Sequence, residues 1–136
     1  MPEMKYLQVV AGIIRQTTDN VTQYLATQRG YGDYKGMWEF PGGKVEPGET
    51  NQQALARELS EELAIQVSVG DFVCTVEQDY PGRHVTMHCY FCDIVKGTPT
   101  LLEHESAQWL TLENIRSVNW LPADISVVER LLSFNT

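Results

Sequence analysis

The stretch from Gly43 to Ile65 reads GKVEPGETNQQALARELSEELAI and contains the strongest helix signal in the chain. Thr50 and Gln53 have the spacing of a capping box, in which each side chain accepts a hydrogen bond from the other residue's backbone N–H. Three leucines then recur every four residues, on one helix face: Leu55, Leu59 and Leu63. The pattern predicts a helix from about Thr50 to Leu63 whose leucine face packs against a core.

Three glutamates lie on another face of this helix. Glu58, Glu61 and Glu62 occur at positions i, i+3 and i+4, so they share that face. Like charges this close repel each other and destabilise an unaided helix. A charge run is usually a solvated helix face. The alternative is a hard-cation site, because Mg²⁺ prefers a few carboxylate oxygens together with substrate phosphates and water.

The residues around these glutamates favour the cation site. The stretch resembles the Nudix box, Gx5Ex7REUxEExGU, where U is an aliphatic residue. The matching residues are Gly43, Glu49, Arg57, Glu58, Leu59, Glu61, Glu62 and Ile65. Ala64 departs from the box, which has glycine there. In a left-handed conformation alanine costs about 1 kcal/mol relative to glycine, so we expect an adjusted local backbone rather than lost activity.

The resemblance covers nearly the whole chain. Further stretches that look like MutT-type and cytidine-triphosphate-type Nudix proteins are Leu7–Arg15, Trp38–Gly43, Arg83–His84, Trp109 and Leu121–Asp124. The resemblance implies an α/β (α+β) fold, an α/β/α sandwich around a mixed β-sheet. It also implies that residues 1–136 form a single Nudix hydrolase domain.

Hydrophobic patterns independently predict the strands and a second helix. Two apolar strands, Tyr6–Arg15 and Val21–Arg29, are joined by the polar turn Gln16–Asn20. The other predicted elements are a long antiparallel pair at Gln66–Tyr80 and Arg83–Val95, short strands at Trp38–Phe40 and Ala107–Leu110, a tight turn at Pro41–Gly43, an irregular segment at Lys44–Glu49, and a helix that starts at Pro122.

Charge and composition exclude several classes of protein. The formal net charge of -8 argues against nucleic acid as a partner, because nucleic-acid binders usually carry a basic face. A small anionic substrate remains compatible if metal ions accompany it. The chain shows neither a signal-peptide pattern nor an apolar run long enough to span a membrane. We therefore expect a cytoplasmic protein with no membrane partner.

Cys89 and Cys92 form a CxxC pair within a predicted strand. Residues three apart in a strand point to opposite faces, so these thiols are not expected to share a metal ion. His84 and His88 share one face of the same strand, where packing or cross-strand hydrogen bonds are expected.

The resemblance implies a metal site at the glutamate face. Glu58 and Glu62 are expected to ligate the ion, and Glu61 either to help ligate it or to orient the attacking water. A carbonyl of Gly42 or Gly43 completes the site, and the expected ion is Mg²⁺, with Mn²⁺ as an alternative. These glutamates are then catalytic as well as metal-binding residues, because the ion activates water and aligns the attack.

Two further charged positions complete the predicted machinery. Arg57 is expected to orient the helix carboxylates through an i, i+4 ion pair with Glu61. Glu103 corresponds best to the loop carboxylate that MutT-type proteins use as a base or extra metal ligand, with Glu105 as the competing choice. His104 between them is expected to be solvated.

The predicted substrate-binding residues are Arg29, Glu39, Phe40, Tyr80 and Asp124. Arg29 matches a position that meets phosphate or sugar, and the two aromatic rings can stack on a base or belong to the core. Asp124 resembles the base-reading position, although it can also be an N-cap. The MutT type has asparagine there, whereas an ionised aspartate accepts hydrogen bonds only and suits the exocyclic amine of cytosine. A buried, protonated aspartate can also donate.

These features predict a nucleoside triphosphate pyrophosphohydrolase that releases a nucleoside monophosphate and pyrophosphate. A cytidine-type substrate, CTP, dCTP or a modified dCTP, is favoured over 8-oxo-dGTP. The alternative from another class is a Nudix-fold module that binds a nucleotide without hydrolysing it. The intact set of box glutamates favours the enzyme. The oligomeric state, monomer or homodimer, is left open.

Overall fold

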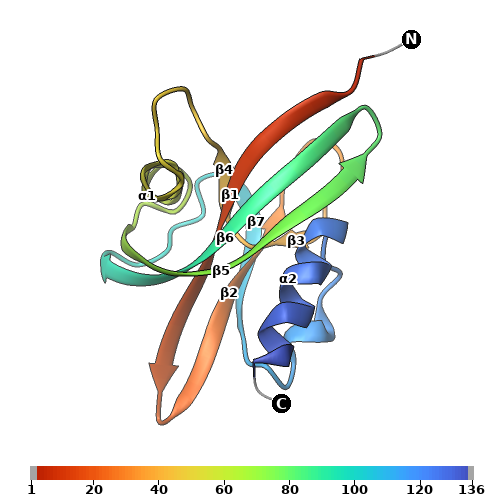
Figure 1. The fold of residues 1–136 in the computed structure, drawn as a ribbon. Coiled ribbons are helices and arrows are strands. Elements are labelled where there is room, and N and C mark those ends of the chain that lie inside the picture. The colour runs from red at the N-terminus through yellow and green to blue at the C-terminus, as the bar shows by residue number, and fades with distance from the viewer. Residues whose placement is uncertain (1–2, 135–136) are drawn as a thin grey trace.

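β1 (Lys5–Thr18) is the strand from which the sheet extends in both directions. It pairs antiparallel with β2 (Val21–Arg29) and β4 (Gly42–Lys44), and parallel with β6 (Arg83–Lys96). The other strands are β3 (Trp38–Glu39), β5 (Gln66–Tyr80) and β7 (His104–Leu110), which complete a mixed seven-stranded sheet. The computed structural model describes residues 3–134 (Figure 1).

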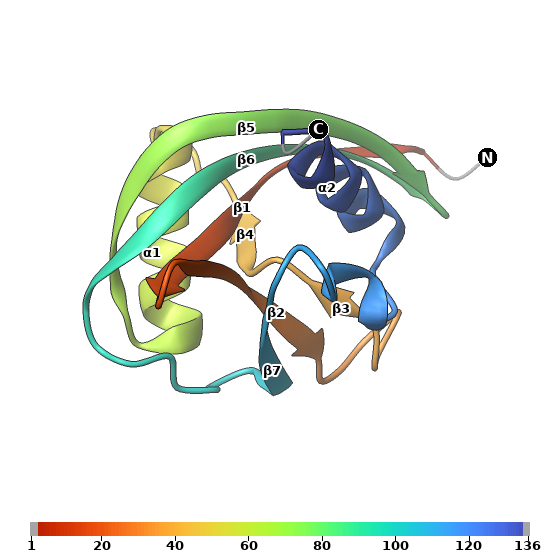
Figure 2. The ribbon, with the colours of Figure 1, turned by 90° about the horizontal axis from the view of Figure 1, so that it is seen from below.

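Two α-helices cover opposite faces of this sheet (Figure 2), which confirms the predicted α/β/α sandwich. α1 (Asn51–Leu63) begins with the predicted capping box between Thr50 and Gln53. α2 (Pro122–Ser133) begins at the predicted proline and is preceded by a 3₁₀ helix, η1 (Ile115–Ser117). Within residues 3–134, no helix has the length and apolar character that crossing a membrane requires.

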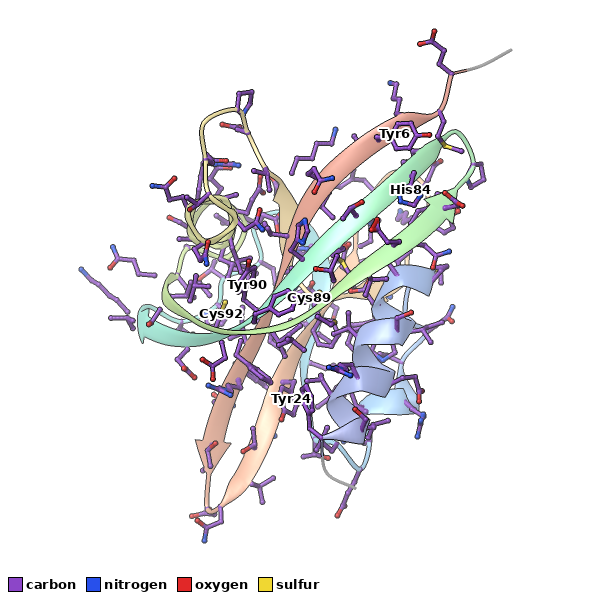
Figure 3. The ribbon with its side chains drawn as sticks, viewed as in Figure 1. Tyr6, Tyr24, His84, Cys89, Tyr90 and Cys92 are labelled. Carbon is purple, nitrogen blue, oxygen red and sulfur yellow. The ribbon has the colours of Figure 1, made fainter. Side chains whose placement is uncertain are left out.

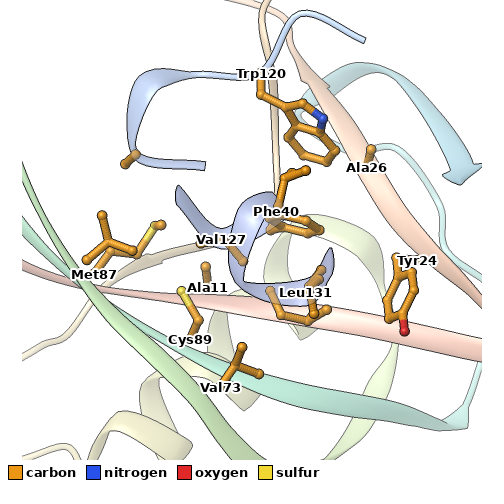
Figure 4. Close-up of a cluster of buried hydrophobic side chains, with 14 of the residues drawn as sticks. Ala11, Tyr24, Ala26, Phe40, Val73, Met87, Cys89, Trp120, Val127 and Leu131 are labelled. Carbon is orange, nitrogen blue, oxygen red and sulfur yellow. The ribbon is translucent and has the colours of Figure 1, made fainter. Parts of the chain in front are cut away.

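The alternation of side chains along β1 builds a core on each side of the sheet. Ala11 and Ile13 join the core under α2, whereas Val10 and Ile14 join the leucines of α1. Figure 4 shows the core on the α2 side, where side chains from the sheet meet those of the helix. Because both faces of β1 are buried, the strand reads as a nearly continuous apolar run.

The two cysteines of the CxxC pair point to opposite faces of β6, as predicted (Figure 3). Cys89 belongs to the core under α2 and Cys92 to the core under α1, and both are buried free thiols. His84 and His88 make the expected cross-strand hydrogen bonds with side chains on β5. The thiols thus lie within the two cores, and the imidazoles bond across the paired strands.

The tight turn predicted at Pro41–Gly43 is wrong for its last two residues, which instead begin β4. A Cβ atom on Gly42 would lie 1.9 Å from the carbonyl oxygen of Val10 on β1. The two backbones approach so closely that glycine is required there. The glycines that indicated a turn in the sequence permit close strand contact in the fold.

Two other boundaries differ from the predicted ones. The turn between β1 and β2 is shorter, because Asp19 and Asn20 both have left-handed φ angles, of 53° and 64°, which suit a two-residue hairpin. β7 begins at His104 rather than Ala107, because its pairing with β2 extends to that residue. This extension brings His104 into the sheet.

Candidate active site

A cleft of about 730 Å³ extends from the glutamate face of α1 to the start of α2. The predicted site residues that line it are Arg29, Glu39, Phe40, Gly42, Gly43, Glu58, Glu62, Tyr80, Glu103 and Asp124. Among the described residues, Arg57 and Glu61 were also predicted for the site but do not line the cleft. The choice between the two loop acids favours Glu103, since Glu105 does not line it either.

The buried leucines of α1 determine where its glutamates point. All three leucines are fully buried, so the side chains of Glu58 and Glu62 turn toward the cleft and are 15% and 13% exposed. Glu61 lies at the edge of this face and is 60% exposed. The structure therefore brings two of the three helix glutamates into the cleft.

Glu62 is a largely buried acid that is crowded by other acids at this end of the cleft. Burial and, after it, the neighbouring charges of Glu58, Glu103 and Glu39 together raise the pKa of its carboxyl group to about 9. Its buried Oε2 atom has no hydrogen-bond partner within residues 3–134. A buried carboxylate oxygen without a partner is costly, unless a cation or another donor reaches it.

This arrangement fits a divalent cation. An ion would satisfy the free Glu62 oxygen and relieve its repulsion from Glu58 and Glu103. Across residues 3–134, no three His, Cys, Asp or Glu side chains converge as a ready-made ligand cluster. Water and the phosphates of a bound nucleotide would supply the remaining ligands of such an ion.

Gly43 allows the Glu58 carboxylate to lie directly against the backbone of β4. A Cβ atom on Gly43 would lie 2.4 Å from Glu58 Cδ, closer than atoms can approach. Any other residue would displace the carboxylate from the cleft. Gly43, the first residue of the Nudix box, thus leaves room for the carboxylate of Glu58.

Arg57 holds the acidic residues around α1 together. Its Nε and Nη2 atoms donate to the two oxygens of Glu49 at 2.8 and 3.0 Å, and its Nη1 donates to Glu58 at 2.9 Å. The predicted pair with Glu61 is present at 3.3 Å. The two-point contact with Glu49 is shorter, so Glu49 is the principal partner. That contact raises the pKa of Arg57 and lowers that of Glu49.

Arg29 and Glu39 form an ion pair inside the cleft. Arg29 Nη2 donates to Glu39 Oε1 at 2.8 Å, and Arg29 Nε donates to Oε2 at 3.3 Å. The prediction that His104 is solvated is wrong, because its side chain is 7% exposed and lies between Glu39 and Glu62. Pairing of β7 with β2 draws the residue inward, and burial lowers its pKa.

The other end of the cleft is aromatic. The rings of Phe40 and Trp120 stack with their centroids 4.5 Å apart. Tyr80 Oη accepts the backbone N–H of Ala123, and its ring meets the edge of Tyr34. Both Phe40 and Tyr80 line the cleft, and both also pack with the hydrophobic core under α2.

Asp124 is buried at this aromatic end, 3% exposed. The N-cap interpretation is wrong, because Leu121 is the N-cap of α2 and Asp124 lies inside its first turn. Its Oδ1 atom instead accepts the backbone N–H of Phe40 at 2.9 Å. Burial raises the pKa of the carboxyl group well above its usual value. The structure thus assigns Asp124 to the cleft wall.

Sequence reasoning gave neither Tyr34 nor His104 a place in the cleft, although both line it. Tyr34 has a left-handed φ of 67°, which is unusual for an aromatic residue and directs its ring against Tyr80. No sequence pattern signals that conformation, although the loop is rich in glycine. His104 was identified but assigned to solvent, and its position follows from the pairing of β7 with β2, which no local pattern signals.

Comparisons with known proteins agree with this geometry. The NUDIX domain family matches residues 6–131. CTP pyrophosphohydrolase of Escherichia coli K12 is 37% identical over 130 residues, covering 96% of this chain and 94% of that protein. The 8-oxo-dGTP diphosphatase of the same organism is 31% identical over 128 residues, covering 94% and 98%. A crystal structure of a MutT protein from Methanosarcina mazei Go1 has a TM-score of 0.84 at 29% identity, covering 98% of each chain.

The chain therefore belongs to the Nudix family, as its box and its sandwich fold both indicate. Within that family it lies among MutT-like hydrolases of nucleotide phosphoanhydride bonds, the group to which these relatives belong. Nudix hydrolases generally need a divalent metal ion.

Proposed function

We propose that this protein is a nucleoside triphosphate pyrophosphohydrolase that releases a nucleoside monophosphate and pyrophosphate. One observation carries the proposal: a single cleft joins the unsatisfied carboxylate of Glu62 to an aromatic pocket containing the buried Asp124. The first end suits metal-bound phosphates and the second suits a base. The relatives named for CTP and 8-oxo-dGTP support the same class of substrate.

Glu58 and Glu62 would hold the ion, with a carbonyl of Gly42 or Gly43, and we propose Mg²⁺, with Mn²⁺ as an alternative. When bound, such an ion activates water, neutralises phosphate charge and aligns the attack. Arg57 keeps Glu58 in place through their 2.9 Å contact. These residues supply position and charge, which is most of what phosphoryl transfer requires of a protein.

Glu103 is the proposed general base, because it lines the cleft beside Glu62 and remains exposed to water. It would take a proton from the attacking water molecule. Glu61 faces solvent beside Arg57, so its proposed part in ligation or water orientation requires its side chain to turn inward.

The test of the reaction is a released-pyrophosphate screen with Mg²⁺ over ordinary, methylated and oxidised nucleoside triphosphates. We expect turnover of at least one class of triphosphate. Hydrolysis in ¹⁸O-labelled water then locates the phosphorus that is attacked. Orthophosphate and diphosphate as primary products would contradict the proposal, and a flat profile would favour the non-catalytic binding module.

We propose a cytidine-type nucleotide as the preferred substrate, on the carboxylate at position 124 and the 37% identical CTP pyrophosphohydrolase. A specific observation favours the second candidate, 8-oxo-dGTP. Burial raises the pKa of Asp124, and a protonated carboxyl group both donates and accepts, as the asparagine of the MutT type does. The same screen ranks CTP, dCTP and 8-oxo-dGTP by kcat/KM.

A further inference from the structure

His104 lies between two carboxylates that come from different parts of the chain. Its Nε2 atom is 3.8 Å from Oε2 of Glu62 on α1 and 3.9 Å from Oε2 of Glu39 on β3. The side chain is 7% exposed, and its Nδ1 atom has no hydrogen-bond partner among residues 3–134. A buried imidazole in the cleft thus directs one nitrogen at two acids.

The chemistry of the neighbours determines which nitrogen carries the proton. A neutral imidazole has one donor and one acceptor nitrogen, whereas the Glu39 carboxylate paired with Arg29, like a metal-bound Glu62 carboxylate, only accepts. The tautomer with the proton on Nε2 therefore presents a donor to both acids. In the opposite tautomer, the unprotonated Nε2 would face carboxylate oxygens, which are also acceptors. The Nδ1–H group would then be buried without a partner, which is costly.

The two acids differ in how firmly they are held. Glu39 is fixed by Arg29, which donates to both of its oxygens. The Oε2 atom of Glu62 that faces His104 has no hydrogen-bond partner in the described part of the chain. His104 therefore lies between a carboxylate that is fixed by Arg29 and a carboxylate oxygen of Glu62 that has no partner in the described chain.

We propose that His104 is a positioning residue, whose Nε2–H holds the Glu62 carboxylate in the orientation that metal binding needs, with the Arg29–Glu39 pair behind it. The proposal rests on the proposed function, in which Glu62 ligates the ion. The present separation exceeds a hydrogen bond, and a shift of about 1 Å in either side chain brings it to the usual distance of about 3 Å. Such contacts often tighten when the complete site assembles.

Two substitutions separate positioning from packing. His104→Leu replaces the imidazole with an apolar side chain of similar size and so removes the Nε2–H donor. His104→Gln keeps an N–H donor at a similar distance from the backbone. The readout is the affinity for Mn²⁺, measured by the electron paramagnetic resonance of the free ion, without nucleotide. Thermal unfolding in EDTA reports the fold of each variant separately.

We expect His104→Leu to weaken Mn²⁺ binding by about tenfold to a hundredfold, as loss of an orienting partner typically does, and His104→Gln to restore most of it. In turnover, His104→Leu lowers kcat more than it changes KM for the nucleotide. Wild-type Mn²⁺ affinity in His104→Leu would overturn the proposal. Equal loss in a folded His104→Gln would overturn the donor role. Should His104→Leu fail to fold, His104→Met replaces it in the comparison.

Two reference variants keep this test distinct from that of the proposed function. Glu62→Gln removes the supposed ligand itself, and unchanged Mn²⁺ binding in that variant would refute the metal site rather than the role of His104. His88→Leu removes a histidine that bonds to Gln8 and Thr75 outside the cleft. It controls for loss of any imidazole and is expected to bind Mn²⁺ normally.

Discussion

Glu62, which is largely buried, and Asp124, which is fully buried, are acids at opposite ends of one cleft, and their surroundings differ. Burial raises the pKa of both carboxyl groups. Glu62 has three acidic neighbours and an oxygen without a partner in the described chain, whereas Asp124 accepts a backbone N–H from Phe40. Glu62 therefore has a carboxyl oxygen without a hydrogen bond, whereas Asp124 has one hydrogen bond within a largely apolar wall.

The difference indicates what each end binds. Repulsion among acids is relieved best by a cation, so the Glu62 end suits metal and phosphate. Asp124 lies among aromatic rings near the Arg29–Glu39 pair and accepts a backbone N–H from Phe40, so this end suits a base that offers hydrogen bonds. Burial of a carboxyl group thus suits cation binding at one end of the cleft and base binding at the other.

The strongest test of this contrast is Glu62→Gln, which keeps the shape of the side chain and removes its charge. We expect turnover with Mg²⁺ to fall by about a hundredfold or more, because a direct ligand is lost. The metal-free fold should remain intact and should be more stable, because the variant no longer buries an ionisable carboxyl group among three acidic neighbours. Steady-state kinetics and thermal unfolding in EDTA measure the two effects. Near-normal turnover would show that the metal site is wrongly placed.

The same variant predicts a pH dependence of stability. The folded-state pKa of Glu62 is about 9 and its ordinary value is 4.5, so the folded protein binds the extra proton between these pH values. Stability in EDTA therefore falls as pH rises through this window. Glu62→Gln lacks that loss, so its advantage in Tm should grow from about pH 5 to about pH 9. A constant difference would contradict the raised pKa.

At the other end, Asp124→Asn is the matched substitution. Asparagine retains an oxygen that can accept the N–H of Phe40, but its amide nitrogen donates where a carboxylate oxygen accepts. We expect kcat/KM for cytosine nucleotides to fall relative to 8-oxo-dGTP by about tenfold to a hundredfold. Kinetics with CTP, dCTP and 8-oxo-dGTP measure this ranking. An unaltered order would leave Asp124 with a structural role and base choice unexplained.

Arg57→Lys tests how the metal end is held rather than what it binds. Lysine keeps the charge but loses the two-point contact with Glu49 and the simultaneous contact with Glu58. We expect about a tenfold loss in kcat/KM, without a change in substrate ranking. Kinetics on the same three nucleotides check both points. A change of ranking would mean that the two ends of the cleft are coupled.

The two ends of the cleft also differ in how much of their structure could be predicted from the sequence. The glutamates, Gly43 and Arg57 lie within 23 consecutive residues and follow helix geometry, so local spacing predicts which of them share a face. Sequence spacing did not predict that Glu61 would remain in solvent, because the packing of the α1 leucines sets the rotation of the helix.

The base end is assembled from residues far apart in the chain, and there local reasoning failed. Asp124 contacts Phe40 across 84 positions, so its N-cap interpretation could not be corrected from its neighbours. His104, which lies at the metal end, was misplaced for a similar reason, since its burial depends on pairing between β7 and β2. Resemblance to the family identified Asp124 as a candidate, whereas spacing alone did not.

The smallest expected effect concerns Ala64, the one departure from the Nudix box at the metal end. We expected its backbone to adjust, and that expectation is wrong: Ala64 keeps the left-handed conformation, with φ 56° and ψ 39°, and its N–H bonds to Ser60 at the end of α1. Helix capping thus prevails over the strain of the alanine side chain.

Ala64→Gly should relieve that strain and raise the free energy of unfolding by about 0.5–1 kcal/mol, since glycine adopts this conformation freely but loses more entropy on folding. The corresponding rise in Tm is about 2–4 °C. Because Glu58 and Glu62 precede the cap and are oriented by the buried leucines, kcat/KM should stay unchanged. Thermal unfolding and kinetics on the same preparation separate the two quantities. A gain in turnover would show that backbone strain at Ala64 also disturbs Glu58 and Glu62. The two ends of the cleft would then differ in backbone strain as well as in the surroundings of their acids.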